Sequence, residues 1–258
     1  MGDRAFAALR ALGVSALAGL IAGVLVVGLG GRIAMRVAGA LTNSPPGSLT
    51  TSNGNALGAV TLEGTLAIIV FVGIPSGILG GVLYAAMRPT LARFGGWAGA
   101  LFGVAALALV GSTVIDPQNL DFRVFGKTPL NVAMFAALFV LFGLAIVPLY
   151  GWVERRSRGA ASMGEVQLGS IASSFAALAA LAGLAVAVYA VVSTLASFDR
   201  ATAADQTVAI AVGLSVLVVA ASLLRASRRS ARFADLAIAA LLLIGAIRTA
   251  SDLATLLT

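Results

Sequence analysis

The feature that most constrains this chain is a series of long apolar runs, bounded by charged or turn-forming residues. The hydrocarbon core of a bilayer is about 30 Å thick, and a helix needs about 20 apolar residues to cross it. Runs of about this length cover residues 11–31, 66–87, 96–115, 130–152, 171–195, 207–224 and 236–257. They predict an all-α transmembrane bundle of about seven helices.

Composition supports the same environment. The chain is 60% hydrophobic and only 10% charged, whereas soluble domains carry about 25% charged residues. No segment between the runs is long or polar enough to form a soluble domain of its own. Changes in composition predict a Gly-rich four-helix membrane half at residues 1–153, a cytoplasmic linker at 154–168 and an Ala/Val-rich three-helix membrane half at 169–258.

The basic residues predict an orientation with the N-terminus inside and the C-terminus outside. Loops on the cytoplasmic side of a membrane protein are enriched in Lys and Arg. With the N-terminus inside, the inner set is larger and consists of Arg4, Arg10, Arg88, Arg93, Arg155, Arg156, Arg158, Arg225, Arg228, Arg229 and Arg232. The outer set is Arg32, Arg36, Arg123, Lys127, Arg200 and Arg248. Tyr84, Trp97, Tyr150 and Trp152 lie near inner ends, as expected of interfacial aromatic residues.

Location and lipid partners follow from the same charges. All but one of the basic residues are Arg, and Ala and Gly are abundant. This composition favours a bacterium with a GC-rich genome, and we therefore expect a multi-pass protein of the bacterial cytoplasmic membrane. The net charge of +7 is concentrated at the ends of runs, so we expect the inner Arg clusters to contact anionic lipids rather than nucleic acid. A cleaved signal peptide ending at residues 38–40 is a less favoured alternative.

Several chemistries are excluded by absent residues. The chain has no Cys and no His, which removes disulfides, thiol nucleophiles and histidine-based metal sites or acid–base catalysis. No Walker A or HExxH motif is present. We expect no cofactor and no metal, and an enzyme using Asp or Glu is less favoured than a binding or structural protein.

Glycines recur every four residues in the first three runs. The set is Gly19, Gly23, Gly73, Gly77, Gly81, Gly95, Gly99 and Gly103. Residues four apart share a helix face, and glycine there lets two backbones approach closely. The pattern predicts packing of the first three helices against one another. A homo-oligomer or another membrane protein packing on these faces is the alternative.

A second set of residues predicts a polar site on the outer side. Arg32 and Arg36 are four residues apart, and Glu63, Asp121 and Arg123 lie in outer segments of the predicted topology. Charges near a bilayer are costly unless they pair or face water, and Arg suits carboxylate or phosphate ligands. These residues are candidates for binding an anionic solute or headgroup. Structural ion pairs are the alternative.

The stretches GGRIAMR at residues 30–36, DFRVFG at 121–126 and LNVA at 130–133 together resemble a group of uncharacterised polytopic membrane proteins from actinobacteria and similar GC-rich bacteria. The resemblance implies no activity, but it implies that the two Arg-containing motifs belong together. We therefore expect an integral membrane protein that binds or transports a small solute or lipid at an outer polar site. The alternative is an accessory subunit packing through glycine-rich faces.

Overall fold

The computed structural model describes residues 2–42, 61–115, 127–160 and 228–257, with isolated positions at 213 and 215. All elements in these ranges are helical, and the ranges contain no strand. The predicted run 171–195 and most of the run 207–224 lie outside the described residues, as do Asp121 and Arg123. The all-helical prediction is confirmed for the described part of the chain.

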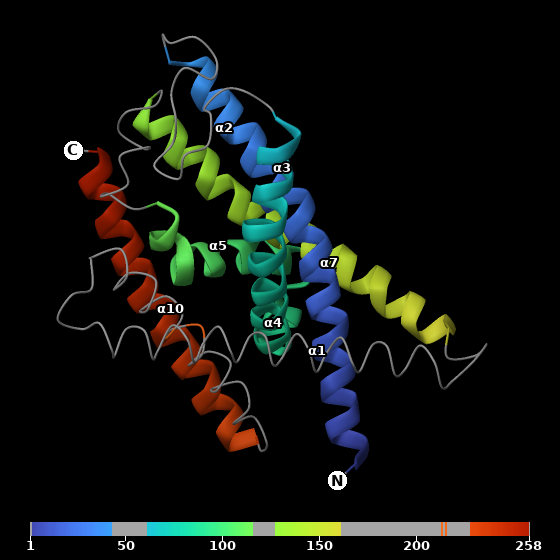
Figure 1. The fold of residues 1–258 in the computed structure, drawn as a ribbon. Coiled ribbons are helices and arrows are strands. Elements are labelled where there is room, and N and C mark those ends of the chain that lie inside the picture. Colours follow the sequence, from blue (N-terminus) through green and yellow to red (C-terminus); the bar gives the residue numbers. More distant parts are fainter. Residues whose placement is uncertain are drawn as a thin grey trace, which may run out of the picture.

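The first apolar run is longer in the structure than its hydropathy predicts. Helix α1 (Gly2–Ala22) continues through a π-helical segment, η1 (Gly23–Gly30), into α2 (Gly31–Ala40). The apolar stretch Arg10–Ala40 has 31 residues. Arg32 and Arg36 therefore lie within a continuing helix rather than just beyond its end (Figure 1).

The second continuous helical stretch contains an internal proline. It consists of α3 (Leu62–Ile68), a π-helical segment η2 (Ile69–Gly73) and α4 (Ile74–Leu91). Pro75 lies at the start of α4, directly after η2. A proline ring clashes with the carbonyl one turn earlier and leaves it without a donor, and a wider π-helical turn at this place relieves that clash.

The third run is shorter as a helix than predicted. A tight 3₁₀ segment, η3 (Ala92–Trp97), precedes α5 (Ala98–Val110), which ends in η4 (Gly111–Thr113). Gly95 in η3 has non-helical angles, φ 52° and ψ −123°. The 13 residues of α5 span about 20 Å at 1.5 Å per residue. That is less than a hydrocarbon core of about 30 Å.

The remaining helices extend past their predicted inner ends. Helix α7 (Thr128–Ala160) has 33 residues and α10 (Arg228–Leu257) has 30. The linker predicted from residue 154 is thus helical as far as Ala160. Its charged residues continue α7 because Glu and Arg have good helix propensity, and polarity alone does not end a helix.

The described chain contains four stretches long and apolar enough to cross a membrane. They are Arg10–Ala40, Leu62–Thr113, Thr128–Ser157 and Arg232–Leu257. In the last two, only 22% of the most apolar window is buried. Large side chains are exposed along these stretches, among them Phe71 in the second and Ile247 in the fourth. A helix that is apolar on its outward face is suited to lipid, so the fold is that of a membrane protein.

Glycines form several close helix contacts in the described part of the chain. Gly19 of α1 and Gly23 at the start of η1 face Gly73, Gly77 and Gly81 across an antiparallel contact, so closely that an added Cβ would meet backbone atoms. Close approach of this kind requires residues without a side chain.

Helices α5 and α7 meet in the same way, so the glycines of the third run pack on the fourth run, and the expectation that they pack on the first two is wrong. A Cβ on Gly99 would lie 2.9 Å from the carbonyl oxygen of Gly143, and one on Gly103 would lie 2.6 Å from that of Phe139. Gly95 is different, and the expectation that it packs between helices is wrong. No atom lies within 4 Å of its Cβ position, because Gly95 serves the turn between α4 and α5 instead.

Helix α10 packs beside α5. A Cβ on Gly245 would lie 2.5 Å from the carbonyl oxygen of Ala108, and the Thr249 hydroxyl donates to that same oxygen at 3.2 Å. Further along, Leu256 packs with Ile115 and Val132 in a small apolar cluster. The contacts therefore proceed along both helices in the same sense, starting from the pair Arg93 and Asp235.

These contacts define two ends of the bundle. The "Arg88 end" holds Arg10, Arg88, Arg93, Glu154 and Asp235, which are linked by contacts between helices. The "Arg32 end" holds α2, the start of α7 and the C-terminal turn of α10 (Figure 1). The main core lies between them and includes Tyr84, Phe102 and Ile146.

Candidate functional site

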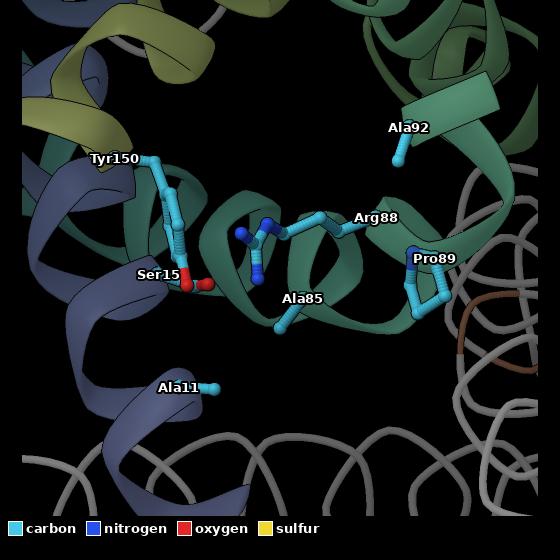
Figure 2. A pocket seen from close by; sticks show the side chains of 7 residues that line it. All are labelled: Ala11, Ser15, Ala85, Arg88, Pro89, Ala92 and Tyr150. Carbon is cyan, nitrogen blue, oxygen red and sulfur yellow. The ribbon is translucent and has the colours of Figure 1, made fainter. Parts of the chain in front are cut away.

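A cavity of about 420 Å³ opens at the Arg88 end between α1, α4 and α7. It is lined by Ala11, Ser15, Ala85, Arg88, Pro89, Ala92 and Tyr150. Figure 2 shows the Arg88 side chain extending from α4 into this space, toward Ser15 on α1 and Tyr150 on α7. The volume is within the range of about 300–1,000 Å³ that small-molecule sites occupy.

The local sequence explains why space remains here. Ala11, Ala85 and Ala92 present only methyl groups to the cavity. Next to the cavity, Gly81 brings α4 against the backbone of Ser15. Helices α1 and α4 are therefore in contact at Gly81, and the space between them lies on the side of Ala11 and Ala85. Pro89 contributes a rigid apolar ring. The wall is therefore mostly apolar, with its polar groups on three side chains.

Arg88 is the charged group of the pocket. Its Cζ lies 4.3 Å from the centre of the Tyr150 ring, which is cation–π geometry. Its Nη2 lies 4.0 Å from Glu154 Oε2, and its charge lies close enough to Tyr84 to act on that hydroxyl electrostatically. The side chain of Arg88 is 45% exposed. The guanidinium is thus positioned by two tyrosines while part of it stays accessible.

The two tyrosines are themselves fixed by packing. The rings of Tyr84 and Tyr150 meet edge to face with centroids 5.8 Å apart. Tyr84 packs in the same manner on Phe102 at 5.2 Å. Both tyrosines are almost fully buried, and edge-to-face pairs of this kind restrict ring motion. The position of Arg88 is therefore defined by groups that do not move easily.

Ser15 supplies an unused polar group. It is completely buried, and its Oγ has no hydrogen-bond partner among the described residues. Leaving a buried hydroxyl unsatisfied costs about 1–3 kcal/mol. A ligand acceptor or a water in the adjoining pocket would remove that cost.

Other polar contacts surround the pocket at the Arg88 end. Arg10 Nη2 donates to Ser157 Oγ at 3.3 Å. Arg93 Nη2 donates to Asp235 Oδ2 at 2.7 Å, and the Thr90 hydroxyl donates to the other carboxylate oxygen at 3.0 Å. These bonds tie α1 to α7 and α4 to α10, so they hold the helices that form the rim.

The residues predicted to form an outer site are only partly brought together. Arg32 is 6% exposed, and its Nη2 lies 3.5 Å from the Thr61 hydroxyl that caps α3. Arg36 and Glu63 are exposed. Asp121 and Arg123 lie outside the described residues. Within the described chain, this region is a contact between α2 and the start of α3.

The pocket at the Arg88 end was not anticipated from the sequence. Arg88 and Tyr150 were recognised only as inner-end residues, and nothing distinguished Ser15 from other small residues of the first run. The available signal was the pairing of Tyr and Arg at the ends of two apolar runs. Their convergence on Ser15 depends on the rotation of three helices about their axes, which hydropathy does not specify.

Comparison with known proteins adds no assignment. No protein-family model, curated protein or solved structure matches the chain.

Proposed function

We propose that this chain is an integral membrane protein that binds, and helps to move, a small solute or lipid with an anionic group. The observation that carries the proposal is the Arg88 guanidinium, positioned by tyrosines beside a largely apolar cavity that contains an unsatisfied Ser15 hydroxyl. Arg forms bidentate bonds with carboxylate and phosphate. An apolar wall beside such a group suits an amphiphilic anion.

The proposed setting is a bacterial cytoplasmic membrane, with about seven spans and the Arg88 end facing the cytoplasm. Support comes from the grouping of Arg10, Arg88, Arg93 and Arg155 at one end, as the positive-inside rule requires of cytoplasmic ends. In this orientation the pocket lies at the depth of the inner-leaflet headgroups. Anionic lipids concentrate at such a surface, so an amphiphilic anion could enter from the bilayer.

A second candidate is the outer polar site around Arg32, Arg36, Glu63, Asp121 and Arg123. The burial of Arg32 favours it, because a charged side chain so little exposed near a membrane has a specific structural or binding role. The resemblance to actinobacterial membrane proteins implies that residues 30–36 and 121–126 belong together. That implication remains a prediction, and it would favour a site that both segments form.

We favour binding over an accessory role through the glycine faces. Gly19, Gly77 and Gly103 already contact other helices of the same chain. A partner that docks on these glycines would first have to displace the helix that already contacts them.

The test uses the full chain in nanodiscs and dodecyl phosphate as the probe. We expect saturable binding to the wild type and a loss of at least tenfold in affinity for Arg88→Gln, since removing a charged hydrogen-bond donor costs about 1.5–3 kcal/mol. Arg155→Gln is the matched control, because Arg155 is exposed at the same end and does not line the pocket. Equal losses in both variants would indicate non-specific attraction and contradict the proposal.

A further inference from the structure

Arg88 has two kinds of partner on α7, one turn apart. Tyr150 covers the guanidinium with its ring, and Glu154 approaches it with a carboxylate. Residues four apart lie on the same helix face, so both partners face the pocket region from one side. One contact is made by a buried aromatic ring, whereas the other is made by a carboxylate side chain that is 26% exposed.

The carboxylate contact is the looser of two ion pairs at this end. Arg88 Nη2 and Glu154 Oε2 are 4.0 Å apart, whereas Arg93 Nη2 and Asp235 Oδ2 are 2.7 Å apart. Charge-assisted hydrogen bonds are about 2.7–2.9 Å long. The Arg88–Glu154 contact is therefore a Coulombic attraction without a formed hydrogen bond, and exposed pairs of this kind contribute only about 0.2–1 kcal/mol.

The geometry of the guanidinium leaves room for another anion. Its hydrogen-bond donors lie in the plane of the group, and the Tyr150 ring is stacked near the central carbon. A ring over the central carbon occupies a face of the group and leaves in-plane N–H groups for other acceptors. These donors can point into the cavity, and the buried Ser15 hydroxyl, which has no partner among the described residues, lies beside its wall.

We propose that Glu154 is a built-in competitor for Arg88, displaced when the phosphate or carboxylate of an amphiphilic ligand enters the pocket. This inference rests on the proposed function. The incoming anion takes the in-plane N–H groups of Arg88 and accepts a hydrogen bond from Ser15. Its apolar part lies along Ala11, Ala85 and Ala92. Glu154, which is already partly exposed, turns toward water.

The charge of Arg88 is compensated both before and after the ligand binds. In the empty protein, Glu154 compensates the charge of Arg88 at the membrane boundary, where an uncompensated charge is unfavourable. In the loaded protein, the ligand provides that compensation instead. Because binding must break an existing contact, the ligand is held less tightly and leaves more easily, which suits a protein that releases its ligand.

The test measures the affinity for dodecyl phosphate in nanodiscs of full-length protein. Glu154→Gln keeps the shape of the side chain and removes its charge. We expect it to bind about two- to fivefold more tightly than the wild type, which corresponds to the loss of one exposed ion pair. Asp235→Asn is the matched control, because Asp235 pairs with Arg93 outside the pocket. It should leave the affinity unchanged.

The outcomes separate this inference from the proposed function. If Arg88→Gln abolishes binding while Glu154→Gln and Glu154→Ala leave affinity unchanged, competition is contradicted and the binding function stands. If Arg88→Gln binds as well as the wild type, both fail. A gain of affinity in Asp235→Asn equal to that in Glu154→Gln would also contradict competition, because it would reflect net charge alone.

Further probes identify the source of the anion. Inorganic phosphate carries the charge without a chain, and dodecanoate carries a carboxylate on the same chain. Strong competition by dodecanoate and weak competition by inorganic phosphate would support an amphiphile entering from the bilayer. Inorganic phosphate competing as well as dodecyl phosphate would contradict the role given to the apolar wall.

Discussion

At the scale of single residues, Ser15 determines a balance between stability and binding. Its buried hydroxyl has no partner in the described structure, so the empty protein carries a cost that a ligand can remove. Ser15→Ala should therefore raise the unfolding temperature of the ligand-free protein, because about 1–3 kcal/mol of unsatisfied polarity is removed. The same variant should bind dodecyl phosphate more weakly. Thermal unfolding in detergent, with and without this probe, measures both effects.

Ser157→Ala is the matched control for this prediction. The Ser157 hydroxyl accepts from Arg10 and donates to the carbonyl oxygen of Glu154. Removing a satisfied hydroxyl should lower stability by about 0.5–1.5 kcal/mol. A fall in stability for Ser15→Ala similar to that for Ser157→Ala would show that Ser15 is satisfied in the native protein.

Tyr150 gives a second prediction at this scale. Tyr150→Leu retains an apolar side chain but removes the ring beneath the Arg88 guanidinium. A cation–π contact at a partly exposed site is worth about 0.5–1 kcal/mol, so we expect affinity for dodecyl phosphate to fall about two- to fivefold. Tyr150→Phe keeps the ring and should retain more of the affinity than Tyr150→Leu. Equal affinities in the two variants would count against positioning by the ring.

At the scale of elements, the antiparallel contact of α1 and α4 depends on having no side chain at its centre. A Cβ on Gly77 would meet the carbonyl oxygen of Gly19 and lie 2.9 Å from the Cα of Gly23. Gly77→Ala should destabilise the protein by about 1–3 kcal/mol, because the helices must separate. Gly31→Ala is the control, since nothing lies within 4 Å of its Cβ position. Unfolding in detergent would distinguish the two variants.

The turn between α4 and α5 offers a matched pair of glycines. Neither Gly95 nor Gly96 has an atom within 4 Å of its Cβ position, but only Gly95 has a positive φ, of 52°. Gly95→Ala should lose about 1–3 kcal/mol through backbone strain, whereas Gly96→Ala should not carry that strain. Equal unfolding temperatures would mean that the turn adopts a different conformation in the bilayer.

Elements also show what the sequence could and could not predict. Apolar length predicted the described helices, and glycine spacing predicted the close contact of Gly19 with Gly77 but not that Gly103 packs on α7. Hydropathy could not predict that α5 ends at Val110, because the residues that follow are apolar or small. The α-helix ends there because the chain tightens into the 3₁₀ segment η4. The polar start of the predicted linker was likewise misleading, because Arg and Glu extend a helix readily.

The pocket was harder to predict than the helices. Ser15, Arg88 and Tyr150 come from three helices that are distant in the sequence. Their meeting depends on which face each helix presents at the Arg88 end, and glycine contacts rather than hydropathy determine those faces. The outer site remains a prediction, since Asp121 and Arg123 are not among the described residues.

At the scale of the whole molecule, the basic residues predict the side of the membrane on which each end lies. Reporter fusions after Arg93, Arg158 and Arg229 should all indicate the cytoplasm, because cytoplasmic loops are enriched in Lys and Arg. Alkaline phosphatase and a fluorescent protein, which are active on opposite sides, provide the readout. A periplasmic signal from any of these positions would contradict the seven-span arrangement with the N-terminus inside.

The bond between Arg93 and Asp235 gives the molecule an order of assembly. Arg93 leaves the ribosome 142 residues before its partner, so the face of α5 that receives Gly245 and Thr249 exists well before α10 is synthesised. Among the described helices, α10 is therefore the last that can take its place, and its contacts through Gly245, Thr249 and Asp235 complete the packing around α5.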